Sequence, residues 1–283
     1  MAVPEFARAK INLTLHVGRR RDDFYHELDS LVVFADIGDE LAFSDADDLA
    51  LDIDGPFGDA LKAEPDNLVL KAARALAREA GIEPRARIAL TKNLPLASGL
   101  GGGSADAAAA LRGLVKLWKA DIGEAALHRI ALSLGADVPV CLYGKPVRME
   151  GIGERLTEVH GVAPLDIVLV NPGVRVATAD VFARLDTRTG TDNPMPAFHG
   201  RDSLIGYLDR SCNDLEKPAA SLAPAIREVV DALCTDEASL IVRMSGSGAT
   251  CYGLYANAGD AAVAATVIAR EHHDWWVKVA RTM

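Results

Sequence analysis

The sequence has few cysteines, few aromatic residues and no long apolar run, and these shortages exclude several classes of protein. None of the four cysteines among its 283 residues lies in a C-x-x-C pair. We expect reduced core thiols, because Cys141, Cys234 and Cys251 lie in apolar runs and Cys212 has no paired spacing. No apolar run reaches 18 residues, and the first residues, MAVPEFARAK, are not a signal peptide. We therefore expect a cytoplasmic protein that does not bind membranes.

Positive charge is also in short supply. Lys and Arg number 30 against 40 Asp and Glu, and the resulting net charge of −10 argues against a nucleic-acid binder. It does not exclude a small anionic ligand, because a few amides and one or two cations decide such binding locally. With 49% hydrophobic residues the chain has enough for one large domain or two ordinary ones. It shows no coiled-coil seam, and we expect a monomer or a weak homodimer.

The common phosphate-binding motifs are missing from the glycine-rich stretch LPLASGLGGGSADAAAALRGLVKLWK, residues 94–119. A Walker A loop ends in Gly-Lys-Ser or Gly-Lys-Thr, whereas here Gly103 is followed directly by Ser104. A dinucleotide fingerprint would need glycine in place of Ser104. The stretch nevertheless leads from glycines into an apolar stripe at helical spacing, which predicts a helix from Ser104 to Lys119.

A glycine-rich loop that leads into a helix is suited to an anion. The missing Cβ atoms let backbone N–H groups approach a phosphate, and the N–H groups of the first helical turn have no partner within the helix. The alternative is a flexible loop before an N-capped core helix. Three consecutive glycines, Gly101, Gly102 and Gly103, favour the anion site because their entropic cost needs a reason.

The segment Ala9–Val17 alternates between apolar and polar residues, which predicts a strand with one buried face. Lys10 and Asn12 would then lie together on the opposite face. The alternative is an ordinary half-solvated strand without chemistry. Downstream, Tyr25 and His26 form an aromatic pair that can stack on a base, although two such residues alone are weak support.

A single carboxylate, Asp137, stands among apolar residues in GADVPV, residues 135–140. Pro139 disfavours the helical conformation at Val138, so we expect Asp137 at a junction between a helix ending at Gly135 and an extended segment. Asp137 is either a loop cap or a partly buried carboxylate whose pKa suits a general base.

A second Gly/Ser loop, MSGSGAT at 244–250, follows an expected strand at Leu240–Arg243. It is either a tight connection between strands or a segment that closes on a ligand. Taken with Lys10, Asp137 and the first loop, it completes the parts of a phosphoryl-transfer site.

Three motifs, AKINL, PLASGLGGGSADAA and MSGSGAT, in this order and at these distances, resemble those of the GHMP (galactokinase, homoserine, mevalonate and phosphomevalonate) kinases. Shorter stretches, YHEL, GADVPV and NDLE, extend the resemblance to nearly the whole chain. It implies a kinase that uses ATP and Mg²⁺, and within the family it implies a cytidine diphosphate-linked methylerythritol as the acceptor.

The resemblance also assigns roles to individual residues. Asp137 matches the base that takes the proton of the acceptor hydroxyl, and Lys10 matches its catalytic partner. The expected ATP-binding residues are Lys92, near the adenine, and Pro95, Leu96, Ala97, Ser98, Gly99, Leu100, Gly101, Gly102, Gly103, Ser104 and Ala105. The expected substrate-binding residues are Asn12, Tyr25, His26, Phe182, Gly246, Ser247 and Gly248. No residue matches a dedicated metal ligand; ATP phosphates and water would hold Mg²⁺, with Ser104 as one possible contact.

The implied fold is α+β, an α/β sandwich in two parts. The first part covers residues 1–157 and the second, ferredoxin-like part covers 158–283, with the site between them. One departure from the family pattern bears on the substrate: in Asp23-Phe24-Tyr25-His26, Phe24 stands where glycine is usual. Phenylalanine disfavours positive φ, so this substitution affects the hairpin and the aim of Tyr25.

Two other functions fit parts of the pattern. A related kinase could phosphorylate mevalonate, homoserine or a sugar, but these acceptors carry no base for Tyr25 and His26 to contact. A nucleotide-binding module without activity would bind ATP without turnover, but it would have no use for both Lys10 and Asp137.

Overall fold

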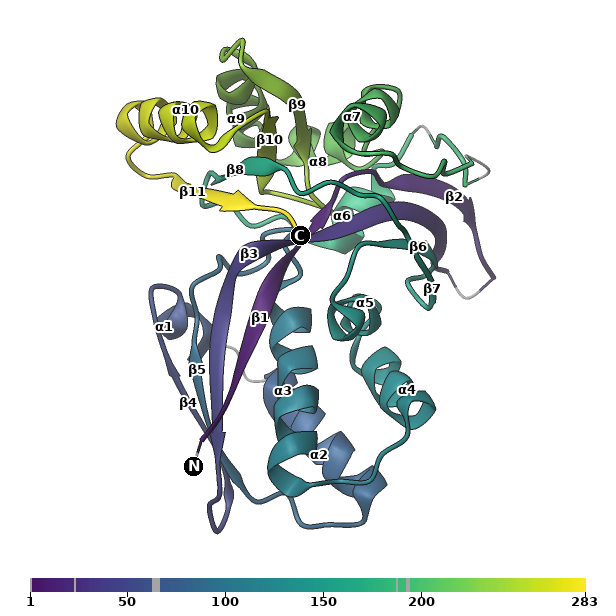
Figure 1. Ribbon diagram of the computed structural model, residues 1–283, viewed down its shortest axis with the longest axis vertical. Helices are drawn as coiled ribbons and strands as arrows, with labels where there is room; N and C mark the ends of the chain where they lie inside the picture. Colours follow the sequence, from purple (N-terminus) through teal and green to yellow (C-terminus); the bar gives the residue numbers. More distant parts are fainter. Residues whose placement is uncertain (1, 23, 63–66, 187, 192–193) are drawn as a thin grey trace. The chain divides into compact units, whose positions relative to one another are not determined.

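The structure, a computed structural model, describes residues 2–22, 24–62, 67–186, 188–191 and 194–283. They form two compact units that are each discontinuous in sequence (Figure 1). The first unit consists of Met1–Ala9, Gly38–Leu96 and Gly101–Gly144, and the second of Lys10–Ile37, Ala97–Leu100 and Lys145–Met283. Strands β1 (Val3–Asn12) and β3 (His26–Ser44) each contribute residues to both units.

The first unit combines a small sheet with packed helices. Strand β5 (Ala86–Thr91) pairs in parallel with β4 (Leu49–Asp54) and antiparallel with the second part of β3. The helices are α1 (Gly58–Lys62), α2 (Leu68–Ala80), α3 (Gly102–Trp118), α4 (Glu124–Leu134) and α5 (Val138–Tyr143). Helix α3 lies close to the sheet because Gly113 has no Cβ, which would overlap the ring of Phe43.

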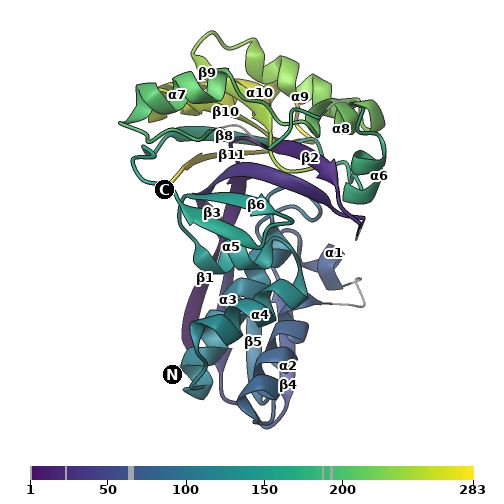
Figure 2. The same cartoon turned by 90° about the vertical axis from the view of Figure 1, so that its right-hand side faces the viewer.

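The second unit contains an antiparallel sheet in the order β11-β8-β10-β9. Its strands are β8 (Asp166–Asn171), β9 (Ser239–Met244), β10 (Cys251–Tyr255) and β11 (Trp276–Arg281). Its helices are α6 (Thr178–Ala183), α7 (Arg201–Asp209), α8 (Glu216–Leu222), α9 (Ala225–Cys234) and α10 (Ala258–Glu271). Helices α9 and α10 pack on one face of this sheet (Figure 2). This connectivity confirms the predicted ferredoxin-like part, and the α+β class is confirmed with it.

A second group of antiparallel strands belongs to the same unit. The first part of β3 pairs with β2 (His16–Arg20) and with β6 (Val147–Gly151), and β6 pairs with β7 (Arg155–Glu158). Arg148 on β6 holds the nearly buried Asp29 on β3 by two hydrogen bonds, of 2.9 and 2.6 Å. The domain boundary predicted near residue 157 stays a prediction.

The sequence predicts a helix that Asp66 and Asn67 cap, that runs through Glu79 and that Gly81 ends, and α2 confirms this helix. The side chain of Asn67 caps α2 by accepting a hydrogen bond from the Val69 N–H at 2.8 Å, and Gly81 ends the helix at φ 67°. Asp66, the other residue of the predicted cap, lies outside the described residues, as does Asp23 of the substrate hairpin. Helix α3 begins two residues earlier than predicted, at Gly102.

Two local predictions are wrong. The strand predicted from Ala9 to Val17 is two strands, β1 and β2, and its polar face is buried rather than solvated, with Lys10 3% and Asn12 0% exposed. Val138 is not extended: it begins helix α5, since Pro139 in the first helical turn needs no N–H donor there. Helix α7 and the β6–β7 hairpin have no counterpart in the sequence predictions.

All four cysteines are free, as predicted, but only Cys141 and Cys251 are buried. Cys212 is half-buried, and Cys234 is exposed on α9, so the prediction of a core position is wrong for Cys234. Among the described residues, no helix has both the length and the apolar character needed to cross a membrane.

Candidate active site

The N-terminus of helix α3 offers backbone donors to an anion. Gly101 precedes the helix at φ 64° and no side chain caps the first turn. The Ala105 N–H donates to the Gly101 carbonyl at 2.8 Å, so the three preceding amides have no partner within the helix. Gly103 is exposed, and Gly102 and Ser104 are half-buried. This geometry suits the phosphate-binding role predicted for the loop.

The middle of the same loop, Ala97–Leu100, packs on the second Gly/Ser loop. The Ser245 hydroxyl donates to the Gly99 carbonyl at 3.0 Å, and the Thr250 N–H donates to the Ser98 carbonyl at 3.0 Å. A Cβ at Gly99 would overlap the Ser245 carbonyl oxygen, so this approach requires glycine. The structure therefore joins two loops that lie about 145 residues apart in the sequence.

Strand β1 delivers Lys10 and Asn12 to this pair of loops. The Lys10 N–H donates to the Leu100 carbonyl at 2.9 Å, and the Asn12 N–H donates to the Ser245 hydroxyl at 3.2 Å. The Asn12 amide nitrogen donates to the Ser30 hydroxyl at 2.7 Å, while its oxygen is buried without a hydrogen-bond partner. A buried acceptor that lacks a protein partner is suited to a donor from a ligand.

The residues predicted to contact a ring also meet in the second unit. His26 and Phe182 stack with ring centroids 5.4 Å apart and an interplanar angle of 17°. Burial lowers the pKa of His26 below its usual value, which favours a neutral imidazole at pH 7. Tyr25 beside it is 58% exposed. The arrangement suits the binding of a flat ring.

The hairpin keeps the conformation that glycine would adopt. Phe24 has φ 70°, in the left-handed region, and it is 75% exposed. The Arg20 guanidinium lies over its ring at 5.1 Å, and the Arg21 N–H donates to the Tyr25 carbonyl at 2.7 Å. The left-handed conformation costs a non-glycine residue about 1–2 kcal/mol. We call residues 95–105, the glycine-rich loop with a predicted phosphate-binding role, the phosphate loop. Ala97 in this loop has φ 49° and carries the same strain.

Asp137 occupies the N-cap position of the short helix α5, with φ −87° and ψ −9°. Its carbonyl accepts a hydrogen bond from the Cys141 N–H at 3.2 Å, and its side chain does not cap the helix. Asp137 is half-buried between buried Val138 and the end of α4, which matches the predicted partly buried carboxylate. Asp137 belongs to the first unit and Lys10 to the second, and their pairing stays a prediction.

Lys92, predicted near the adenine, is 1% exposed in the first unit. Its ammonium lies 2.5 Å from carboxylate oxygens of both Asp39 and Asp106. Burial alone would lower the pKa of Lys92, but the two carboxylates outweigh burial and raise it, so the group stays charged. Asp39 also accepts hydrogen bonds from the N–H groups of Asn93, at 2.6 Å, and Leu94, at 2.8 Å. The cluster thus fixes the chain where it enters the phosphate loop.

Asp106 in this cluster is expected to make stability depend on pH. Burial, with a contribution from Asp39, raises the pKa of Asp106 from 3.8 to about 7. Between these values the unfolded chain releases the proton that the folded chain keeps, so rising pH favours unfolding. The free energy of unfolding should fall as pH rises toward about 7 and then level off. Urea unfolding of wild type and Asp106→Asn at a series of pH values measures this loss.

The Asp106→Asn variant should lack this fall, while Asp121→Asn, at an exposed site, should follow the wild-type curve. Parallel curves for wild type and Asp106→Asn would contradict the assignment.

Several residues outside the predicted set support the site. The Asn213 amide donates to the carbonyls of Met244 and Gly246, both at 2.8 Å, and so holds the second Gly/Ser loop. The Met244 N–H donates to Glu216 at 2.8 Å. NDLE, which contains Asn213 and Glu216, was one of the motifs, but spacing alone does not show what its side chains contact. Asp106 did have a signal, as a lone carboxylate among alanines on α3.

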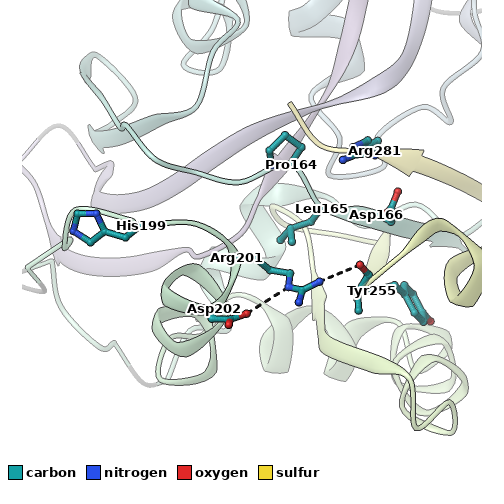
Figure 3. Close-up of a pocket in the computed structure, with 9 residues that line it drawn as sticks. Pro164, Leu165, Asp166, His199, Arg201, Asp202, Tyr255 and Arg281 are labelled. Carbon is teal, nitrogen blue, oxygen red and sulfur yellow. Dashed lines mark hydrogen bonds and ion pairs between the residues drawn. The ribbon is translucent and has the colours of Figure 1, made fainter.

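A hollow of about 400 Å³ in the second unit contains none of the predicted site residues. Arg201 in it donates to the Ala256 carbonyl at 3.1 Å and lies 3.5 Å from the Asp202 carboxylate (Figure 3). The lining also holds both cations and acids, Arg281 and Asp166 among them, and so does not favour ligands of one charge.

Two family models match the chain. The model described as the GHMP kinases N terminal domain matches residues 67–145, which include the phosphate loop and Asp137. The model described as GHMP kinases C terminal matches residues 195–274, which include the second Gly/Ser loop.

Full-length relatives agree with these models. The chain is 50% identical over 281 residues to 4-diphosphocytidyl-2-C-methyl-D-erythritol kinase of Parvibaculum lavamentivorans, covering 98% of this chain and 97% of the relative. It is 51% identical over 287 residues to the protein of the same name from Ruegeria pomeroyi, covering all of both chains. A crystal structure of 4-(cytidine 5'-diphospho)-2C-methyl-D-erythritol kinase superposes with a TM-score of 0.78 at 33% identity, covering 98% of both chains.

Proposed function

This chain belongs to the GHMP kinase family, and we infer that it transfers the γ-phosphoryl group of ATP to the 2-hydroxyl of 4-(cytidine 5'-diphospho)-2-C-methyl-D-erythritol. The reaction belongs to the methylerythritol phosphate route to isoprenoid precursors. Among the family's acceptors this one carries a base, and the stacked rings of His26 and Phe182 are the observation that favours it. The enzyme is a small-molecule kinase that uses ATP.

The phosphate loop binds the donor in this proposal. The amides of Gly102, Gly103 and Ser104 point along the helix axis toward an anion, and the helix dipole adds to their attraction. Phosphoryl transfer depends mainly on positioning and on neutralising the charge that develops on the phosphoryl oxygens. The contacts among Gly99, Ser245 and Asn12 fix the loop before ATP arrives.

Asp137 accepts the proton of the 2-hydroxyl, and Lys10 stabilises the negative charge on that oxygen. The Lys10 N–H donates to the Leu100 carbonyl, and this bond holds the backbone of β1 beside residues 97–100. Asp137 starts a helix that leaves its carboxylate uncommitted to capping. These two roles are the core of the proposed mechanism.

Mg²⁺ would neutralise charge on the ATP phosphates, with the Ser104 hydroxyl as a protein contact. Within the described ranges, one group of His, Cys, Asp or Glu side chains is placed to share a cation, namely His16, Cys212 and Asp214. Its thiol and imidazole suit softer metals than Mg²⁺. We propose that ATP phosphates and water hold most of the Mg²⁺ coordination positions. The cytoplasmic location and the monomeric or weakly dimeric state stay predictions.

An acceptor panel tests the assignment. ATP consumption should be rapid with 4-(cytidine 5'-diphospho)-2-C-methyl-D-erythritol and near background with mevalonate, homoserine or galactose, because only the first offers a base to the ring site. Comparable turnover of mevalonate would exclude the cytidyl assignment. Binding of ATP without turnover of any acceptor would instead support the nucleotide-binding module.

Removing one side of the ring site should weaken acceptor binding selectively. We expect His26→Ala to raise KM for the cytidyl acceptor roughly 5- to 150-fold, since stacking on a base contributes about 1–3 kcal/mol. KM for ATP should stay near the wild-type value. His160→Ala is the matched control, at a side chain that is 84% exposed. Equal effects on both substrates would contradict a ring-specific role.

A further inference from the structure

A second cluster of reactive side chains lies in the second unit, apart from the residues assigned above. One imidazole nitrogen of His16, Cys212 Sγ and a carboxylate oxygen of Asp214 all lie within 4.8 Å of one another. Cys212 Sγ is 3.9 Å from His16 Nδ1 and 3.3 Å from Asp214 Oδ1. His16 is 5% exposed, whereas Cys212 and Asp214 are half-buried. Two of the three residues are therefore partly accessible to solvent.

Backbone hydrogen bonds hold the two segments that carry these donors. The Leu15 N–H donates to the Cys212 carbonyl at 3.0 Å, and the Asp214 N–H donates to the Leu15 carbonyl at 2.9 Å. The Asp214 carboxylate accepts the Val17 N–H at 2.8 Å, which orients its remaining oxygen. The three side chains therefore meet although His16 and Cys212 lie nearly 200 residues apart in the sequence. Hydrogen bonds hold both segments in place.

The donor set has a recognisable chemistry. Imidazole, thiolate and carboxylate together suit Zn²⁺ and its spectroscopic substitute Co²⁺, and three protein ligands leave a fourth position for water. Donor atoms separated by 3.3–3.9 Å can share one cation at bond lengths of about 2.0–2.3 Å. We propose that His16, Cys212 and Asp214 form a binding site for one divalent cation of the zinc class.

Binding requires two small rearrangements. The Cys212 thiol releases its proton to solvent as the sulfur–metal bond forms, and the imidazole binds through its unprotonated Nδ1. Thr189, whose hydroxyl now lies 2.7 Å from His16 Nδ1 and 2.9 Å from Asp214, must turn away from the histidine. Thr189 can keep its hydrogen bond to Asp214. It would then orient this metal ligand without binding the metal itself.

The site adjoins the clamp on the second Gly/Ser loop. Cys212 and Asp214 flank Asn213, whose amide holds the Met244 and Gly246 carbonyls. Cys212 and Asp214, which would bind the cation, are the residues on either side of Asn213. A cation that binds only the folded chain stabilises the folded conformation of this segment by shifting the folding equilibrium toward it. The metal site itself does not depend on the proposed kinase reaction.

Titration of the reduced, metal-free full chain with Co²⁺ tests the proposal. Wild type should bind one equivalent with a thiolate-to-cobalt charge-transfer absorption, and added Zn²⁺ should abolish this absorption by displacing Co²⁺. Cys212→Ser should lose the absorption. Cys234→Ser, which removes an exposed cysteine outside the cluster, should keep it.

Thermal unfolding supplies a second measurement. Zn²⁺ should raise the melting temperature of wild type and of Cys234→Ser but not of Cys212→Ser, and without metal all three should melt alike. Absence of the charge-transfer band in wild type, or its survival in Cys212→Ser, would overturn the proposal and leave the cluster as a hydrogen-bond network.

Discussion

Asp137→Asn is expected to lower kcat by roughly 10²–10⁴-fold, the usual scale for loss of a general base. Asparagine has nearly the same shape but cannot accept the hydroxyl proton. The Asp137 carbonyl still accepts the Cys141 N–H in the variant, so helix α5 should persist. ATP affinity should be retained, because the proposed phosphate donors are backbone amides of α3. Steady-state kinetics with the cytidyl acceptor and a direct ATP-binding assay measure the two effects.

The matched control is Asp121→Asn, which changes an exposed carboxylate in the segment between α3 and α4. It removes the same charge and should leave kcat unchanged. If Asp137→Asn keeps the wild-type kcat, Asp137 is not the base. If it loses ATP binding as well, its effect is structural rather than on proton transfer.

Lys92→Met is expected to destabilise the protein by about 3–5 kcal/mol, the typical result of removing one partner from a buried ion pair. Methionine fills a similar volume but leaves the carboxylates of Asp39 and Asp106 facing each other without a cation. The two groups are 0% and 3% exposed, so water does not compensate the loss. Urea unfolding at neutral pH measures the change in free energy.

Lys62→Met is the control for this substitution. Lys62 pairs with Asp59 at 2.9 Å on the surface, where solvent screens the interaction, and its loss should have no measurable effect. A Lys92→Met variant as stable as wild type would show that the cluster carries no net stabilisation. Part of the expected loss should be recovered at lower pH, where Asp106 takes up a proton.

The elements that the sequence predicted best are those whose signals are local. Helix α2 has a capping Asn67 and a terminal Gly81, and α3 has glycines before a long apolar stripe, so both are specified within a few residues. The sequence did not predict helix α5. A residue before proline only tends to avoid the helical conformation, and Val138 is helical because proline is well tolerated in a first helical turn. The alternation of apolar and polar residues at 9–17 predicted one buried face, but both faces are buried in the folded chain.

Local sequence patterns did not predict which strands pair with one another. The sequence from Glu40 to Ile53, with its Asp-rich turns, predicts a strand pair. In the structure β3 and β4 are not neighbours, because β5 from farther along the chain pairs with both. A hairpin and a separated pair have the same local pattern of apolar residues. The choice between them depends on which later strand competes for the edge, and that is a property of the whole fold.

The sequence by itself determined the family and the candidate site residues: the glycine loop, Lys10, Asp137, His26 and the second Gly/Ser loop can be recognised from residue type, order and distance. Only the tertiary structure decided what those residues contact. It buried Lys92 between Asp39 and Asp106, stacked His26 on Phe182 and joined Asn12 to Ser245. Residue type and short spacing act within a turn or a strand, whereas these partners are selected by packing between segments far apart in the chain.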